Sequence, residues 1–223
     1  NLTFSETTFM KNQRNQHIKT STRTSIPTHT DILIIGGVAT GPKAAARVRR
    51  LAPQLSITIV ERTEEISYAG CGLPFFVSGE VLHIRDLMTT YSGEIRDPAY
   101  FEKLKGVRVL THTEALAINR EHKKVQLVDL RSGQVFSMRY GWMVLATGSQ
   151  PLELDLQGNH LKGIHCLHRP GDAVAIRKAI TSGEVKRAVV VGAGPIGLEA
   201  VEALVKNKVI TTLVEILPTP APK

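Results

Sequence analysis

Short apolar runs alternate with glycine turns and helix-forming segments along this chain, a pattern that predicts an α/β fold. Four of the early runs predict strands: 32–35, 56–60, 107–110 and 143–147. The first of these is continuously apolar and fits a strand that is buried in a parallel sheet. Two further runs flank a turn at Ser132-Gly133 and predict a β-hairpin: 125–128 and 135–138. Residues that favour helix occupy 42–51 and 98–105.

The same order of elements begins again towards the C-terminus. An apolar run at 188–191 is followed by a glycine turn, a helix-forming segment at 198–204 and another apolar run at 211–214. We therefore expect two Rossmann-like units. The first is a domain over residues 31–150, and residues 151–223 hold a linker and an incomplete second domain.

Composition narrows the class of protein. The 223 residues are 42% hydrophobic, which suffices for a globular core, and no apolar run approaches the roughly 18 residues that span a bilayer. The net charge of +8 comes from basic residues spread along the chain, so we expect no nucleic-acid partner and no membrane partner. Cys71 and Cys166 lie far apart without metal-ligand spacing, which argues against a disulfide or a metal site and favours a reducing, cytoplasmic location.

Residues 1–30 differ in composition from the rest of the chain. They are rich in Thr, Ser, Asn and basic residues and carry a single acid, Glu6. This composition is typical of disorder and only weakly typical of an organelle transit peptide. Because the sequence begins at Asn1 and Met10 offers an internal start, we interpret residues 1–30 as a disordered or artefactual tail.

A glycine-rich turn joins the first predicted strand to the first predicted helix, and its residues are Gly36, Gly37, Val38, Ala39 and Gly41. Such a turn lets backbone N–H groups at a helix N-terminus approach a pyrophosphate. Glu61 ends the next strand, 20 residues after Gly41, where a Rossmann unit places the acid that binds ribose hydroxyls. Val38 stands at the central position of GxGxxG, so the motif alone leaves an ordinary βαβ turn open.

The second turn carries the complete GxGxxG pattern, in Gly192, Gly194 and Gly197. Glu215 ends the strand that follows, and Glu199 lies in the intervening helix; we assign both to the nucleotide site. An acid at the end of this strand repels a 2′-phosphate and accepts hydrogen bonds from ribose hydroxyls. We therefore expect NADH at the second turn, with NADPH as the alternative.

Cys71 lies shortly after the second strand, between Gly70 and Gly72 and before Pro74. A lone cysteine is usually a buried small hydrophobic residue. Here the flanking glycines allow close approach of a flat ligand, and the position is at the carboxyl edge of the sheet, where ligands bind. A thiol near a helix N-terminus in such a place is suited to act as a thiolate that attacks disulfides.

Residues 35–41 and 67–81 resemble the single-cysteine branch of the pyridine nucleotide-disulfide oxidoreductases, which contains coenzyme A-disulfide reductases, NADH-dependent persulfide reductases and NADH oxidases. That branch often has valine at the position of Val38. It typically reads Ser-Phe-Ala-Asn-Cys-Gly-Leu-Pro-Tyr where this chain has Tyr68 for Phe and Gly70 for Asn. In the family that Asn helps to bind substrate, so the change at Gly70 bears on substrate affinity or identity.

The resemblance implies an FAD domain of the three-layer ββα type, followed by the start of an NAD(P)H domain. It implies that Ala146, Thr147 and Gly148 pack near the flavin, and we also assign Arg62 and Ala115 to the flavin site. Hydride from NADH would reduce FAD, and the electron pair would pass to a disulfide that involves Cys71. A mixed disulfide or persulfide at Cys71 would suit a coenzyme A-disulfide or persulfide reductase, and a sulfenic acid would suit an NADH oxidase or peroxidase.

Three residues match substrate positions of coenzyme A-disulfide reductases: Arg50, Ser67 and Lys105. The residues alone support an alternative interpretation equally well, in which Arg50 is a solvated helix end, Ser67 a loop hydroxyl and Lys105 a surface lysine. An aromatic residue that often shields the flavin in the family is Pro195 here, so access to the nicotinamide pocket is expected to differ. We expect His165 and His168 to be surface residues and Cys166 to be a buried thiol.

The resemblance covers residues 31–217, whereas the family normally continues through the rest of the NADH domain, a second flavin-binding segment and a dimerisation domain. We therefore expect that residues 1–223 alone bind FAD poorly and are inactive, with apolar surface and an unpaired sheet edge exposed. The catalytic description then belongs to a parent protein, expected to be a homodimer that acts on a small disulfide, a persulfide or oxygen. The rival hypothesis is a truncated, non-catalytic nucleotide-binding module.

Overall fold

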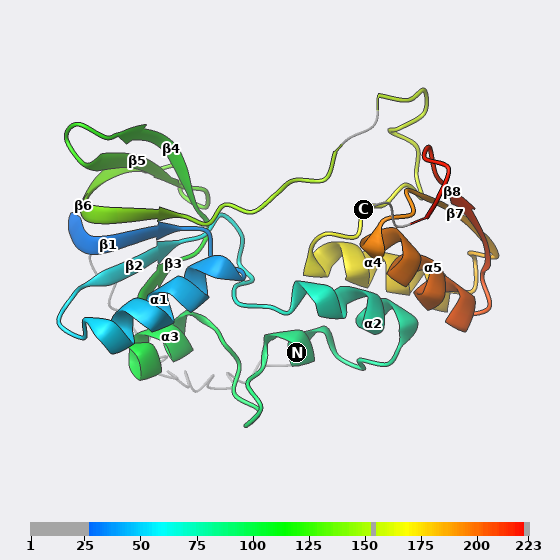
Figure 1. Cartoon of the computed structure of the whole chain (residues 1–223), viewed down its shortest axis with the longest axis horizontal. Helices are drawn as coiled ribbons and strands as arrows, with labels where there is room; N and C mark the ends of the chain where they lie inside the picture. The colour runs from blue at the N-terminus through cyan, green and yellow to red at the C-terminus, as the bar shows by residue number, and fades with distance from the viewer. Residues whose placement is uncertain (1–26, 153–154, 221–223) are drawn as a thin grey trace, which may run out of the picture.

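The computed structural model describes residues 27–152 and 155–220, which form a larger and a smaller α/β unit (Figure 1). The strands of the larger unit are β1 (His29–Ile35), β2 (Ile57–Val60), β3 (Arg108–Leu110), β4 (Thr113–Asn119), β5 (Lys124–Asp129) and β6 (Val135–Leu145). Its helices are α1 (Thr40–Leu51), η1 (Gly70–Gly72), α2 (Leu73–Ser78), η2 (Ile84–Met88) and α3 (Pro98–Lys105). The smaller unit contains α4 (Pro170–Thr181), β7 (Arg187–Val191), α5 (Pro195–Lys206) and β8 (Ile210–Val214).

The larger unit is built on one sheet with the strand order β3-β2-β1-β6-β5-β4. Strands β3, β2, β1 and the second half of β6 are parallel, whereas β4, β5 and the first half of β6 form an antiparallel meander. Strand β6 is therefore shared: Met138 pairs with Val125 of β5, and Leu145 pairs with Ile35 of β1. This long strand turns the sheet so that the meander covers one face of the parallel part.

The core of the larger unit has two layers, one on each face of the parallel strands. Helices α1 and α3 cover one face, where Ala45 and Phe101 pack against Ile34 and its neighbours in β1 and β2. On the other face, Leu33 packs against the buried side chains of the meander, such as Leu127. Helix, parallel sheet and meander make three layers, so the expected ββα arrangement is confirmed.

The smaller unit has two parallel strands, β7 and β8, in register from Arg187↔Ile210 to Val191↔Val214. Helix α5 connects them and ends in a left-handed turn at Lys208, which has φ +61°. The backbone N–H of Lys208 donates to Val205 O, and that of Val209 donates to Leu204 O, which is the Schellman pattern that usually places glycine at this position. Apolar side chains of both strands are exposed, as expected: Val189, Val191, Ile210 and Val214.

Several elements differ from the prediction. Strand β1 begins at His29, inside the segment interpreted as a tail, and residues 1–26 lie outside the described residues. The predicted strands at 135–138 and 143–147 are a single 11-residue strand, β6. Strand β4 was not predicted, and α4 lies in a region that we interpreted as a linker. Among the described residues, none of the helices combines the length and the apolar character needed to cross a membrane.

Candidate functional site

The first glycine turn, between β1 and α1, admits no side chain at its two outer positions. Gly36 has φ +113°, and a Cβ atom built on it would lie 2.0 Å from the carbonyl oxygen of Ala146. A Cβ atom on Gly41 would lie 1.9 Å from the carbonyl oxygen of Gly36. Glycine is therefore required both for the backbone conformation and for the close contact between the start of α1 and the strand that precedes it.

Glu61, at the end of β2, is held against this turn. Its Oε2 accepts from the backbone N–H of Gly37 at 2.7 Å, and its Oε1 accepts from the backbone N–H of Thr63 at 2.9 Å. The carboxylate is thus fixed beside the turn, at the carboxyl edge of the sheet. Arg62 follows it and lies 3.7 Å from the carboxylate of Glu114, the residue before Ala115 in β4.

The second turn repeats most of this geometry. Gly192 has φ +99°, and a Cβ atom on Gly197 would lie 1.9 Å from Gly192 O, as between Gly41 and Gly36. The Oε2 of Glu215 accepts from the backbone N–H of Ala193 at 2.6 Å. The N–H of Leu217, at 2.9 Å, and then that of Ala193 hold the pKa of Glu215 below its ordinary value. Both acids are therefore built into the same strand–turn–helix frame.

Both turns fit the pyrophosphate of a dinucleotide. The first-turn N–H groups of α1 and α5 have no acceptor within their own helices and are available to an anion. A Cβ atom on Gly194 would meet no atom within 4 Å, so the space beside this residue is open for a pyrophosphate to approach the backbone. Val38 and Ala39 complete the first turn, and Glu199 lies partly buried in α5.

The segment after β6 also reaches the first turn. The N–H of Ala146 donates to Ile35 O at 2.8 Å, which places Ala146 directly beside Gly36. Thr147 and Gly148 follow and are exposed, and Gly148 has φ +67°. The structure therefore brings the three predicted residues 146–148 to the same edge as the first turn.

Cys71 lies in η1, and its residue is exposed. The segment that leads to it is anchored to the first turn, because the N–H of Ser67 donates to Gly37 O at 2.8 Å. Ser67 is buried and has φ +51°, a conformation that few non-glycine residues adopt. The thiol is thus presented to solvent four residues beyond a fixed point of the nucleotide turn.

The two glycines beside Cys71 have different roles. A Cβ atom on Gly72 would lie 2.4 Å from the end of the buried Leu87 side chain, so a larger residue here requires that side chain to move. A Cβ atom on Gly70 would have no neighbour nearer than Tyr68, at 4.0 Å. Burial raises the pKa of the Tyr68 phenol, which keeps it neutral beside the thiol segment. Gly70 thus leaves open the space that a side chain would fill.

The three predicted substrate residues lie in two places. Ser67 is near Cys71, whereas Arg50 and Lys105 end α1 and α3 at the opposite edge of the sheet. The ends of these helices are joined by Arg49, which sequence reasoning missed: its guanidinium donates to Lys105 O at 3.1 Å and to Gly106 O at 2.6 Å. The ammonium group of Lys105 lies 5.5 Å from the ring centroid of Tyr100.

A shallow groove of about 530 Å³ runs along α1 and is lined by Ala39, Thr40, Lys43, Ala44 and Arg47. Lys43, Arg47 and Arg50 are spaced four and three residues apart, so they lie on one face of the helix. This groove begins at the first turn and points towards the edge where Arg50 and Lys105 lie. No motif drew attention to Lys43 and Arg47, although their helical spacing was visible in the sequence.

The remaining predictions concern residues outside this arrangement. Cys166 is exposed, so the prediction of a buried thiol was wrong: its segment has no regular structure and leaves it uncovered. His165 is exposed and His168 is partly buried. In the ranges 27–152 and 155–220, no three His, Cys, Asp or Glu side chains are grouped in a way that would hold a metal ion.

Comparison with known proteins identifies the family. Residues 30–223 match the family model described as pyridine nucleotide-disulphide oxidoreductase. The chain belongs to this family. Its members use FAD and NAD(P)H, which agrees with the two turns described above.

The curated relatives come from the predicted branch. The chain is 33% identical over 184 residues to the NAD(P)H coenzyme A polysulfide/persulfide reductase of Pyrococcus horikoshii, covering 82% of this chain and 39% of the relative. It is 32% identical to the coenzyme A disulfide reductase of Staphylococcus haemolyticus, covering 82% and 40%. It is 29% identical to the NADH oxidase of Methanocaldococcus jannaschii, covering 86% and 41%. The chain thus spans about two fifths of the length of these relatives.

Solved structures agree with this assignment. A NAD-dependent persulfide reductase from A. fulgidus is 40% identical, with a TM-score of 0.83 over 86% of this chain and 35% of that chain. The water-forming NADH oxidase from Lactobacillus brevis, bound to NADH, is 26% identical, with a TM-score of 0.79 over 87% and 41%. The fold and the family of the chain are therefore those expected from its motifs.

Proposed function

We propose that the protein carrying this chain is an NAD(P)H-dependent flavoprotein that reduces coenzyme A disulfide or a low-molecular persulfide, with Cys71 as its redox thiol. The observation that carries the proposal is the exposed thiol of Cys71 on a segment hydrogen-bonded to the first dinucleotide turn. An exposed cysteine on a segment that is anchored to a dinucleotide turn supports the role of a thiol that exchanges electrons with a bound flavin.

The groove along α1 supports coenzyme A as part of the substrate. Coenzyme A carries its thiol at one end and several phosphates at the other, so it needs a site that is long and positively charged. Lys43, Arg47 and Arg50 line one face of α1, and Lys105 ends the neighbouring helix. Arginine and lysine at such spacing suit phosphate groups. The proposed substrate thus has its sulfur at Cys71 and its phosphates along α1.

The chemistry of this chain's residues follows from thiol–disulfide exchange. The Cys71 thiolate attacks one sulfur of the substrate disulfide, whose S–S bond breaks to release one thiolate and leave a mixed disulfide on Cys71. Two electrons then cleave the mixed disulfide, which frees the second thiolate and regenerates the Cys71 thiolate; the released thiolates take protons from solvent. FAD and NAD(P)H, when bound, supply those two electrons.

Glu215 supports NADH as the electron donor. Its carboxylate is fixed beside the second turn, where a 2′-phosphate would meet a negative charge. We therefore propose a preference for NADH over NADPH.

An NADH oxidase is the second candidate, favoured by similarity to the proteins of that name from Methanocaldococcus jannaschii and Lactobacillus brevis. In that case Cys71 would cycle through a sulfenic acid with oxygen as acceptor. A single exposed thiol serves either chemistry, so the electron acceptor distinguishes the two candidates.

The test measures NADH oxidation by the whole purified protein that carries this chain. Under anaerobic conditions with coenzyme A disulfide, the expected result is turnover that disappears in Cys71→Ser and persists in the matched control Cys166→Ser. Turnover with oxygen alone, unaffected by added disulfide, would favour the oxidase. If the protein binds no flavin, or if Cys71→Ser turns over disulfide normally, the proposed function is wrong.

A further inference from the structure

Helix α2, which directly follows Cys71, packs against the smaller unit. Its side chains Leu73, Phe76 and Val77 are buried in a cluster that includes Ala173 of α4 and Ala203 of α5. The two alanines are 0% and 2% exposed, and their small size lets both helices approach α2 closely. Figure 1 shows α2 lying beside α4 and α5, away from the larger sheet. Helix α2, which begins two residues after Cys71, is therefore the surface against which the smaller unit packs.

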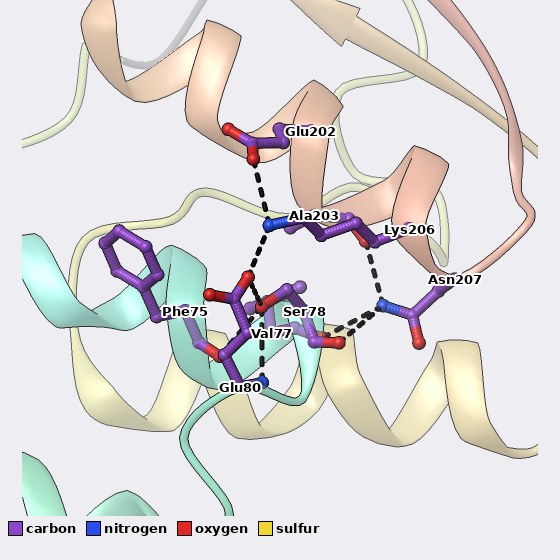
Figure 2. Close-up of polar contacts among 8 residues, drawn as sticks. All are labelled: Phe75, Val77, Ser78, Glu80, Glu202, Ala203, Lys206 and Asn207. Carbon is purple, nitrogen blue, oxygen red and sulfur yellow. Dashed lines mark hydrogen bonds and ion pairs between the residues drawn. The ribbon is translucent and has the colours of Figure 1, made fainter.

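Asn207, just after the end of α5, makes the central polar contact of this interface (Figure 2). Its side-chain Nδ2 donates to Ala203 O at 2.8 Å, to Ser78 O at 3.2 Å and to Val77 O at 3.4 Å. The last carbonyl groups of a helix lack intrahelical donors. Asn207 thus caps the C-terminus of α2 from a position 129 residues later in the chain.

Two further residues, Lys206 and Arg177, make polar contacts near Asn207. Lys206 forms ion pairs with Glu80 and with Glu202, but these side chains are 44–64% exposed, so the pairs contribute little. Arg177 of α4 donates to Val81 O at 2.8 Å, and its guanidinium lies 4.5 Å from the ring centroid of Phe76. Among these contacts, Asn207 alone ties the last turn of α2 to α5.

We propose that Asn207 is a positioning residue for hydride transfer, a role that rests on the proposed function. Helix α5 begins at the second dinucleotide turn and ends at Asn207, so a 12-residue helix of about 18 Å separates this residue from the pyrophosphate site. Asn207 therefore does not touch the nucleotide. It holds α5 against α2, and the segment that leads into α2 is anchored to the first turn through Ser67. Asn207 thereby fixes the distance between the two dinucleotide sites.

The experiment uses the whole flavin-loaded protein and follows flavin reduction by NADH in an anaerobic stopped-flow instrument. For Asn207→Ala, the limiting rate constant is expected to fall about tenfold or more, because misplacement of reacting groups by even 1 Å is costly. The dissociation constant for NADH is expected to stay within about twofold, since the turn is intact. Asn119→Ala is the matched control: its amide accepts from His122 N at 2.9 Å in the β4–β5 turn, far from α2.

A folded, flavin-loaded Asn207→Ala protein with the parent's limiting rate constant would overturn the proposal. Weaker NADH binding with an unchanged limiting rate would overturn it as well, because Asn207 would then support the binding site alone. If Asn207→Ala does not fold, Asn207→Ser decides by the same criterion, since its hydroxyl is too short to reach both helices. Failure of the parent protein to reduce its flavin with NADH would instead refute the proposed function.

Discussion

Alanine at Gly41 and at Gly197 is expected to disable the two dinucleotide sites separately. In either variant the new Cβ atom would lie 1.9 Å from a backbone carbonyl oxygen of the same turn, and about 1.1 Å of movement is needed to reach even 3.0 Å, the shortest separation that Cβ atoms ordinarily show. The atoms that must move are backbone atoms at the start of α1 or α5, the same atoms that present N–H groups to a pyrophosphate.

A displacement of about 1 Å at such a site costs roughly 100-fold in function, equivalent to about 2.7 kcal/mol. We expect Gly41→Ala to lose bound flavin, measured as the ratio of visible to ultraviolet absorbance. Gly197→Ala should keep its flavin but require about 100-fold more NADH to reduce it. Gly171→Ala is the matched control, because it lies in the first turn of α4 and its Cβ atom would meet no atom within 4 Å.

The pattern of losses tests the assignment of each turn. If Gly197→Ala loses flavin while Gly41→Ala retains it, the two sites are assigned the wrong way round. If both variants behave like Gly171→Ala while circular dichroism reports native structure, then neither turn binds a pyrophosphate, and the steric reasoning fails.

Three other predictions follow from local geometry. Lys208→Gly should raise the free energy of unfolding by about 0.5–1 kcal/mol in urea titrations, because glycine relieves a left-handed residue at the end of α5; a decrease would contradict this. The Leu217 N–H holds the pKa of Glu215 below 4.5, so the native state binds fewer protons and loses stability as the pH falls below about 4.5. Glu215→Gln should show a smaller loss in thermal unfolding over that range, and an equal loss would refute the linkage. Gly70→Asn should fold normally and lower the KM for coenzyme A disulfide, whereas Gly72→Asn should lower the unfolding temperature because its side chain meets Leu87. An unfolding temperature that falls in Gly70→Asn and not in Gly72→Asn would contradict this packing.

The dinucleotide frames were predictable because each depends on residues close in sequence. A glycine is needed where the chain turns with positive φ, and an acid ends the following strand within about 25 residues. Glu61 and Glu215 therefore stand where the spacing places them. The flanking glycines predicted that a ligand could approach Cys71 closely, and the exposure of this residue is compatible with that prediction.

The length of β6 was not predictable from its apolar runs alone. Arg139 and Gly141 interrupt the pattern, yet the strand continues because Tyr140 is buried and Gly141 lies against β1. A Cβ atom on Gly141 would be 2.8 Å from Asp31 O, so this glycine marks close approach of two strands rather than a turn. The need for glycine at position 141 thus comes from the neighbouring backbone of β1, which is far away in sequence.

Helix α4 carried local signals that the linker interpretation overlooked. Pro170 stands at its start, and the carboxylate of Asp172 accepts from the backbone N–H of Arg169 at 2.8 Å. The seating of α2 on α5, by contrast, joins residues about 130 positions apart, and no local pattern encodes it. Arg49 and Asn207 were missed for the same reason, because both act on backbone carbonyls of remote segments.

The segment from Ala146 to Leu152, which has no regular structure, leaves the larger sheet and runs towards the smaller unit (Figure 1). Because this segment is part of the covalent connection between β6 and α4, the packing of α4 and α5 on α2 is an intramolecular association, for which effective concentrations are on the order of millimolar when the linker is short. The contacts among α2, α4 and α5 therefore act at a higher effective concentration than the same surfaces would on separate chains. Proteolytic cleavage within this segment is therefore expected to let the two units separate, even though every residue of the interface, Asn207 included, is unchanged.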